Sequence, residues 1–189
     1  MSLDAALIAL GVVFLAELGD KSQLIALTFA ARGRPIAVLA GISVAVAILQ
    51  ALAVGAGAAL GSMLPDRPIQ IVAGIAFLGF AAWTLRADDD DDPTVERIPP
   101  AAHAIAIAAG TAFFVAELGD KTQLATVALA STNGALGTWL GSLIGQVAAD
   151  ALAIIIGARI GSRLPERALR LASAGAFVLF GVLLLVGLG

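Results

Sequence analysis

A nine-residue phrase carrying three charged side chains occurs twice in this chain, one hundred positions apart. It reads AELGDKSQL at residues 16–24 and AELGDKTQL at residues 116–124, so the copies differ only at Ser22 and Thr122. Both copies are surrounded by apolar sequence. Ionisable side chains are costly to keep within a bilayer, and those found there usually serve a function. The phrase therefore predicts a functional site in each half of the chain.

Long charge-free segments indicate a membrane protein. No charged residue occurs at positions 35–65, 122–149 or 171–189. Charged residues make up 13% of the chain, whereas a soluble globular domain has about 25%. A spanning helix needs about 20 mostly apolar residues. We therefore expect an all-α membrane protein with six transmembrane helices, at residues 4–30, 35–62, 68–85, 101–130, 135–159 and 168–188.

The repeat extends beyond the charged phrase. At the same offset of one hundred, for example, Gly41 matches Gly141 and Phe77 matches Phe177. Each repeat holds three predicted helices, and because three is odd, the second copy enters the membrane from the opposite side. We expect two inverted three-helix repeats, at residues 1–86 and 101–189, with a binding site at their interface near the bilayer midplane. A duplicated bundle without transport activity is less favoured, because the charged segment is the best-preserved part of the repeat.

The arginines predict an orientation in the membrane. Eight lie in the loops after the first, third and fifth predicted helices, and Arg67 is the one arginine elsewhere. Cytoplasmic loops carry the excess of basic residues. We therefore expect both termini to be extracytoplasmic and residues 87–100 to form an acidic cytosolic linker between the repeats. The run of five aspartates at residues 88–92 suits a solvated, extended segment.

The residue types in the phrase point to a divalent cation. On a continuous helix, Glu17 and Asp20 would share one face, and Gly19 between them would let another helix approach closely. Carboxylate and amide oxygens are hard ligands that suit Mn²⁺, Ca²⁺ or Mg²⁺. Softer metals are disfavoured, because the chain has no cysteine and its one histidine, His103, lies near a predicted loop. The predicted metal ligands are Glu17, Asp20, Gln23, Glu117, Asp120 and Gln123.

Counting charges adds protons to this prediction. The four acids of the two phrases carry −4 and the two lysines +2, so one divalent cation would neutralise the set. Without the cation, burial and mutual repulsion favour protonation of some of the carboxyl groups. Cation and protons would then compete for the same oxygens, which is the minimum requirement for exchanging one against the other.

Five further residues are assigned supporting roles: Lys21, Ser22, Lys121, Thr122 and Asp150. Each lysine is four residues from its glutamate, so it could pair along one helix, move between carboxylates, or extend to a water-filled vestibule. Asp150 lies near the centre of the fifth predicted helix, where a lone acid indicates function. It could be a further ligand, a proton carrier or the partner of a lysine.

The doubled Glu-x-Gly-Asp-Lys-Ser/Thr motif, on two three-helix repeats, resembles the Gdt1 and transmembrane protein 165 family (uncharacterised protein family 0016). The resemblance covers essentially the whole chain and implies Mn²⁺ or Ca²⁺ transport coupled to H⁺. It also implies that Glu17 to Ser22 and Glu117 to Thr122 form the two signatures. The long N-terminal extension of eukaryotic members is absent here, which fits a bacterial plasma (inner) membrane protein.

We therefore predict a secondary transporter exchanging Mn²⁺, or Ca²⁺, for H⁺, with the cation as cargo and no resident cofactor. A passive divalent-cation channel and an exporter of small basic solutes are the alternatives. We expect no enzymatic activity, because a hydrolase acting on lipid phosphate would want an arginine clamp, and every arginine lies in a loop or at a helix end. The expected partners are the cation, protons and the lipid bilayer, not nucleic acid. The sequence leaves the oligomeric state, the stoichiometry and the direction of transport open.

Overall fold

All secondary structure in the described part of the chain is α-helical, which confirms the predicted all-α class. The structure is a computed structural model and describes residues 3–30, 34–86, 101–160 and 166–187. The predicted linker at residues 87–100 lies outside this part. The helices are α1 (Leu3–Glu17), α2 (Lys21–Ala30), α3 (Pro35–Met63), α4 (Asp66–Arg86), α5 (Ala102–Glu117), α6 (Lys121–Thr132), α7 (Ala135–Ile160) and α8 (Glu166–Val186).

Several of these helices are long and apolar enough to cross a bilayer. Residues 35–63, 67–86 and 135–155 each meet this requirement alone. The pair α5 and α6 meets it together, although its two helices meet at an angle of 71°. The described residues thus hold three or four candidate spans, and the full set of six stays a prediction.

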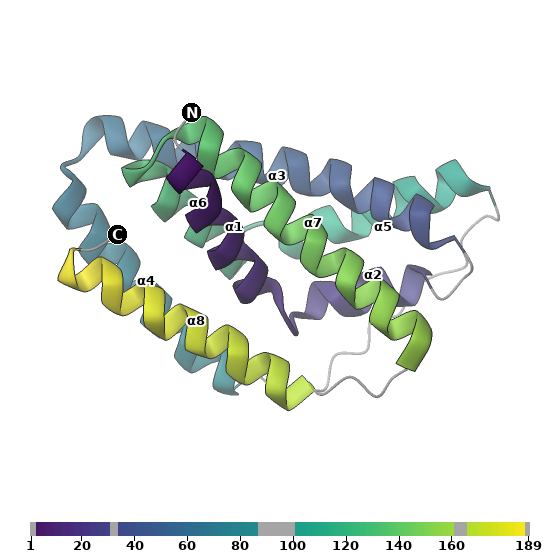
Figure 1. Ribbon diagram of the computed structural model, residues 1–189. Helices are drawn as coiled ribbons and strands as arrows, with labels where there is room; N and C mark the ends of the chain where they lie inside the picture. The colour runs from purple at the N-terminus through teal and green to yellow at the C-terminus, as the bar shows by residue number, and fades with distance from the viewer. Residues whose placement is uncertain (1–2, 31–33, 87–100, 161–165, 188–189) are drawn as a thin grey trace.

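Two of the expected continuous helices are broken at the charged phrases. The first predicted span is divided into α1 and α2, and the fourth into α5 and α6. The break between α1 and α2 is visible near the centre of Figure 1. The prediction that Glu17 and Asp20 share a face of one helix is therefore wrong, because the chain turns between them. Broken helices within a membrane expose backbone groups, which is tolerated where they are buried in protein or line a cavity.

The helices of the first half pack against those of the second half. Helix α1 packs along α7, α3 along α5 and α4 along α8 (Figure 1). Glycines allow the closest approaches: a Cβ at Gly41 would overlap the Ala106 backbone, and a Cβ at Gly141 would overlap the Ala6 backbone. The two contacts are equivalent, because Gly41 corresponds to Gly141 and Ala6 corresponds to Ala106 at the repeat offset of one hundred residues. The sequence repeat is thus also a repeat of tertiary contacts.

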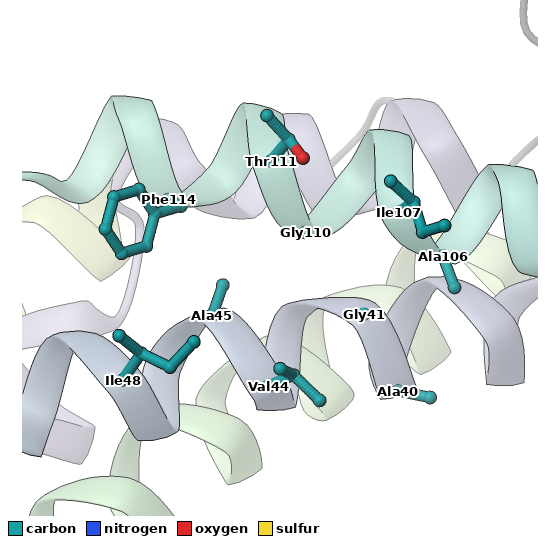
Figure 2. A pocket seen from close by; sticks show the side chains of 10 residues that line it. All are labelled: Ala40, Gly41, Val44, Ala45, Ile48, Ala106, Ile107, Gly110, Thr111 and Phe114. Atoms are coloured by element: carbon teal, nitrogen blue, oxygen red, sulfur yellow. The ribbon is translucent and has the colours of Figure 1, made fainter.

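A groove of about 430 Å³ lies between α3 and α5 (Figure 2). Gly41 and Gly110 bring the two backbones together there. Apolar side chains such as Val44, Ile48 and Phe114 line the groove, and Thr111 contributes its polar side chain. A groove of this composition offers no charged group to a cation.

The contact between α4 and α8 contains residues at equivalent positions of the two repeats. The rings of Phe77 and Phe177 lie 5.7 Å apart between centroids and are tilted by 57°. At one end of this contact, the guanidinium of Arg67 donates hydrogen bonds to the carbonyl oxygens of Leu184 (3.3 Å) and Leu185 (2.7 Å). Basic side chains commonly satisfy the last carbonyls of a helix in this way. Arg67, the exception in the arginine distribution, thus has a structural role at the end of α8.

Candidate cation site

Each charged phrase forms the same tight turn between two helices. Helices α1 and α5 end at Glu17 and Glu117, and within the turn that follows, Gly19 and Gly119 have φ angles of 76° and 82°. This left-handed conformation is strained for residues with a Cβ, which explains the glycines. No neighbouring atom lies within 4 Å of a Cβ built at Gly119. The glycine therefore serves backbone conformation, and the expectation that it admits a neighbouring helix is wrong for Gly119.

Replacing Gly119 by Ala tests this explanation. We expect the free energy of unfolding to fall by about 1–2 kcal/mol, the strain of one left-handed non-glycine residue. Gly175 is the matched control, because a Cβ there also meets nothing within 4 Å but its backbone is helical. Gly175→Ala should leave stability unchanged or raise it by up to about 1 kcal/mol. Thermal unfolding of the two variants in detergent provides the measurement, and equal melting temperatures would contradict the explanation.

The glutamines of the phrases hold these turns in place. The Oε1 atom of Gln23 accepts a hydrogen bond from the Gly19 backbone N–H at 3.0 Å, and Gln123 accepts one from Gly119 at 3.1 Å. Gln23 also donates from Nε2 to the carbonyl oxygen of Ala149 on α7, at 3.4 Å. The amide oxygens are therefore engaged with the turn backbone. A role of either glutamine as a cation ligand stays a prediction.

The two phrases converge on Glu17, which is fully buried. Its Oε1 atom accepts a hydrogen bond from the Ser22 hydroxyl at 2.6 Å, and its Oε2 atom accepts one from the Thr122 hydroxyl at 3.0 Å. Ser22 belongs to the same phrase and Thr122 to the other one. The hydroxyl residue that follows each lysine thus orients one shared carboxyl group.

An ion pair also crosses between the phrases. The ammonium group of Lys121 pairs with Oδ1 of Asp20. It lies 5.9 Å from the centroid of the Phe177 ring, which contacts the Phe77 ring in the α4–α8 interface. This distance is within the range of a cation–π contact. Lys121 is buried and does not pair with the glutamate four residues before it, so neither pairing along one helix nor extension to a vestibule describes it. The side chain of Lys21 lies outside the described part of the structure.

Three of the four phrase carboxylates form a cluster. Glu17, Asp20 and Glu117 each present one oxygen, and these oxygens lie within 4.8 Å of one another. Oxygens on opposite sides of a Ca²⁺ ion are about 5 Å apart, so the spacing is compatible with one divalent cation. Asp120 is not part of the cluster. It caps the N-terminus of α6, where its Oδ2 atom accepts a hydrogen bond from the Thr122 backbone N–H at 3.4 Å.

A chain of two glutamines supports Glu117 from outside the phrases. The Nε2 atom of Gln146 on α7 donates to Oε2 of Glu117 at 3.1 Å. Gln146 in turn accepts a hydrogen bond from Nε2 of Gln50 on α3 at 2.5 Å. All three side chains are buried. Their sequence signal was weak, because each glutamine is a lone amide within a mostly apolar helix, and only the packing of α3 and α7 brings them to the site.

Asp150 lies close to the cluster and belongs to no pair. It interacts electrostatically with Glu17 and Asp20, yet its two carboxyl oxygens are buried and have no hydrogen-bond partner. Asp150 therefore does not pair with Lys121, whose ammonium group is on Asp20. The whole site is built from oxygen ligands, and His103 is exposed near the start of α5. This donor set suits hard divalent cations.

Comparison with known proteins places this arrangement in a family. The sequence profile described as "Divalent cation/proton antiporter GDT1" matches residues 5–92 and 105–188. A Vibrio cholerae protein named "Putative manganese exporter" is 34% identical over 180 residues, covering 93% of this chain and 87% of its own length. The "GDT1-like protein sll0615" of Synechocystis is 30% identical, with 90% and 91% covered. "Protein PAM71, chloroplastic" of Arabidopsis thaliana is 31% identical, with 89% and 53% covered.

No solved structure matches this chain significantly. The family match covers both repeats and includes both charged phrases. It confirms the resemblance inferred from the doubled motif, and the apolar helices agree with a protein that crosses the membrane several times. The chain is therefore a multi-pass membrane protein that belongs to the GDT1 family of divalent cation/proton antiporters.

Proposed function

We propose that this protein exchanges Mn²⁺ for H⁺ across the plasma membrane, with Ca²⁺ as an alternative substrate. The observation that carries the proposal is the convergence of both phrases on one cluster of acids. Glu17 accepts a hydrogen bond from Thr122 of the other phrase, and carboxyl oxygens of Glu17, Asp20 and Glu117 lie within 4.8 Å of one another. A cluster of this kind within apolar helices needs a compensating positive charge.

Lys121 provides part of that charge while the cation is absent. Its ammonium group pairs with Asp20, one of the three clustered acids. An incoming cation that binds Asp20 displaces the ammonium group, and protons on the remaining carboxyl groups are released by the cation's charge. The same oxygens then hold either the cation or the lysine and protons. This alternation is the chemical basis that we propose for exchange.

The choice of Mn²⁺ rests on two observations. The ligands are oxygens only, which excludes the thiolate and imidazole sets preferred by softer metals. A Vibrio cholerae relative that aligns with most of this chain is named "Putative manganese exporter". Ca²⁺ prefers the same oxygen ligands, and a flexible cluster accommodates either ion.

The contact symmetry supports two inverted three-helix repeats as the moving parts. Gly41 against Ala106 and Gly141 against Ala6 are equivalent contacts at an offset of one hundred. In transporters built from inverted repeats, one repeat rocks against the other around a site near the midplane. The arginine distribution supports extracytoplasmic termini and a cytosolic linker at residues 87–100.

Purified protein in proteoliposomes tests the proposed exchange. The vesicles are loaded with Mn²⁺, and the outside is made more acidic than the lumen. We expect Mn²⁺ to leave faster as this proton gradient increases, and the lumen to become more acidic. Vesicles without protein provide the baseline. Mn²⁺ flux that does not depend on the proton gradient would indicate a channel. Proton movement driven by free lysine in the buffer, rather than by Mn²⁺, would indicate an exporter of basic solutes. An absence of Mn²⁺ flux would refute the proposal.

A further inference from the structure

Among the described acids of the site, Asp150 differs in having no hydrogen-bond partner. Its side chain is fully buried at the centre of α7, and neither carboxyl oxygen has a hydrogen-bond partner. By contrast, Glu17 accepts two hydroxyl donors, Glu117 accepts an amide donor and Asp20 pairs with Lys121. The arrangement leaves Asp150 without the stabilisation that the other three acids have.

The described groups that interact electrostatically with Asp150 are acidic. Glu17 and Asp20 interact with it electrostatically, and so does Glu117 of the second phrase. Lys121, the described lysine of the site, pairs with Asp20. An ionised carboxylate that is buried without donors is strongly destabilised even before repulsion is added. A carboxyl group in these surroundings is therefore suited to the neutral, protonated state.

The geometry also separates Asp150 from the cation cluster. The oxygens within 4.8 Å of one another come from Glu17, Asp20 and Glu117, and Asp150 contributes none. Position 150 also breaks the symmetry of the repeats, because its equivalent in the first repeat is Gln50. Gln50 is neutral and is used as a donor to Gln146. One repeat thus has a proton-binding group where the other has an amide.

We propose that Asp150 carries one of the protons exchanged for the cation, while the clustered acids bind the cation itself. The inference rests on the proposed exchange function. When the cation enters the cluster, its charge favours ionised Asp150: the O–H bond breaks, the proton leaves to water and the electron pair stays on the carboxylate. When the cation leaves, Asp150 takes up a proton again. The acid of one repeat thereby links proton occupancy to cation occupancy.

Proton release on Mn²⁺ binding tests this role directly. Calorimetric titration of purified protein with Mn²⁺ in buffers of different ionisation enthalpy gives the number of protons released per ion. We expect Asp150→Asn to release about one proton fewer than the wild type. We expect its Kd for Mn²⁺ to rise by about tenfold at the pH at which the wild type releases this proton, because by linkage the ionised carboxylate of the wild type adds that much to the affinity. Asp150→Glu keeps an acid and should retain the wild-type proton count.

Each outcome of this experiment decides the inference. An unchanged proton count in Asp150→Asn refutes it, and so does a loss of Mn²⁺ affinity as large as that of Glu17→Gln, which would make Asp150 a ligand. If Asp150→Asn does not fold, Asp150→Gln replaces it, because the equivalent position of α3 already holds a glutamine. Failure of the exchange function is distinguishable: the wild type itself would then show no Mn²⁺-dependent proton release.

Discussion

Replacing Glu17 by Gln is expected to reduce Mn²⁺ transport at least about 100-fold, because loss of an outer partner of a metal ligand already costs 10- to 100-fold. The substitution keeps the size of the side chain and removes its charge. It also replaces one of two acceptor oxygens by a donor, so that the amide nitrogen faces the hydroxyl group of Ser22 or Thr122. Cation binding and the contact between the two phrases are then both weakened.

The measurement is Mn²⁺ flux in proteoliposomes, together with the melting temperature of the purified variant. Asp4→Asn is the matched control, since Asp4 is an exposed acid in the first turn of the same helix. It removes the same charge from α1 and should leave flux unchanged. Flux of Glu17→Gln within a factor of three of wild type, in folded protein, would contradict the proposed site.

Replacing Lys121 by Met is expected to change binding and transport in opposite directions. The ammonium group competes with the cation for Asp20. Unit charges 4 Å apart interact by about 4 kcal/mol near a protein surface, so removal of the ammonium group should tighten Mn²⁺ binding by at least about tenfold. Transport should fall, because the cation-free state would hold Asp20 without its partner. Tighter binding to one state slows release from it.

Mn²⁺ titration and proteoliposome flux together give this prediction two independent readouts. Lys121→Arg is the control that retains positive charge beside Asp20, and its Kd should stay near that of the wild type. Weaker Mn²⁺ binding in Lys121→Met would show that the lysine organises the site rather than competing for it. Unchanged binding and unchanged flux would show that the ion pair with Asp20 plays no part in exchange.

The local turn of the charged phrases was open to prediction but was missed. Gly19 and Gly119 each precede an aspartate that can cap a helix, and a glycine followed by such a cap is a signal for a helix break. The apolar flanking sequence favoured one long helix instead. In the structure the chain turns there, with φ angles of 76° and 82° at the two glycines. The break places Glu17 at a helix end and Asp20 after the turn.

The sequence by itself determined the class of protein, the repeat and the residue types of the site. Composition and the doubled phrase were sufficient, because charge-free segments of helical length and acids placed within them have few other uses. Only the tertiary structure decided which groups meet. The contacts that build the site join segments far apart in the chain: Thr122 with Glu17, Lys121 with Asp20, and Gln146 with Glu117. They depend on how α1, α5, α6 and α7 pack, and helix packing is set by the shapes of whole surfaces rather than by local sequence.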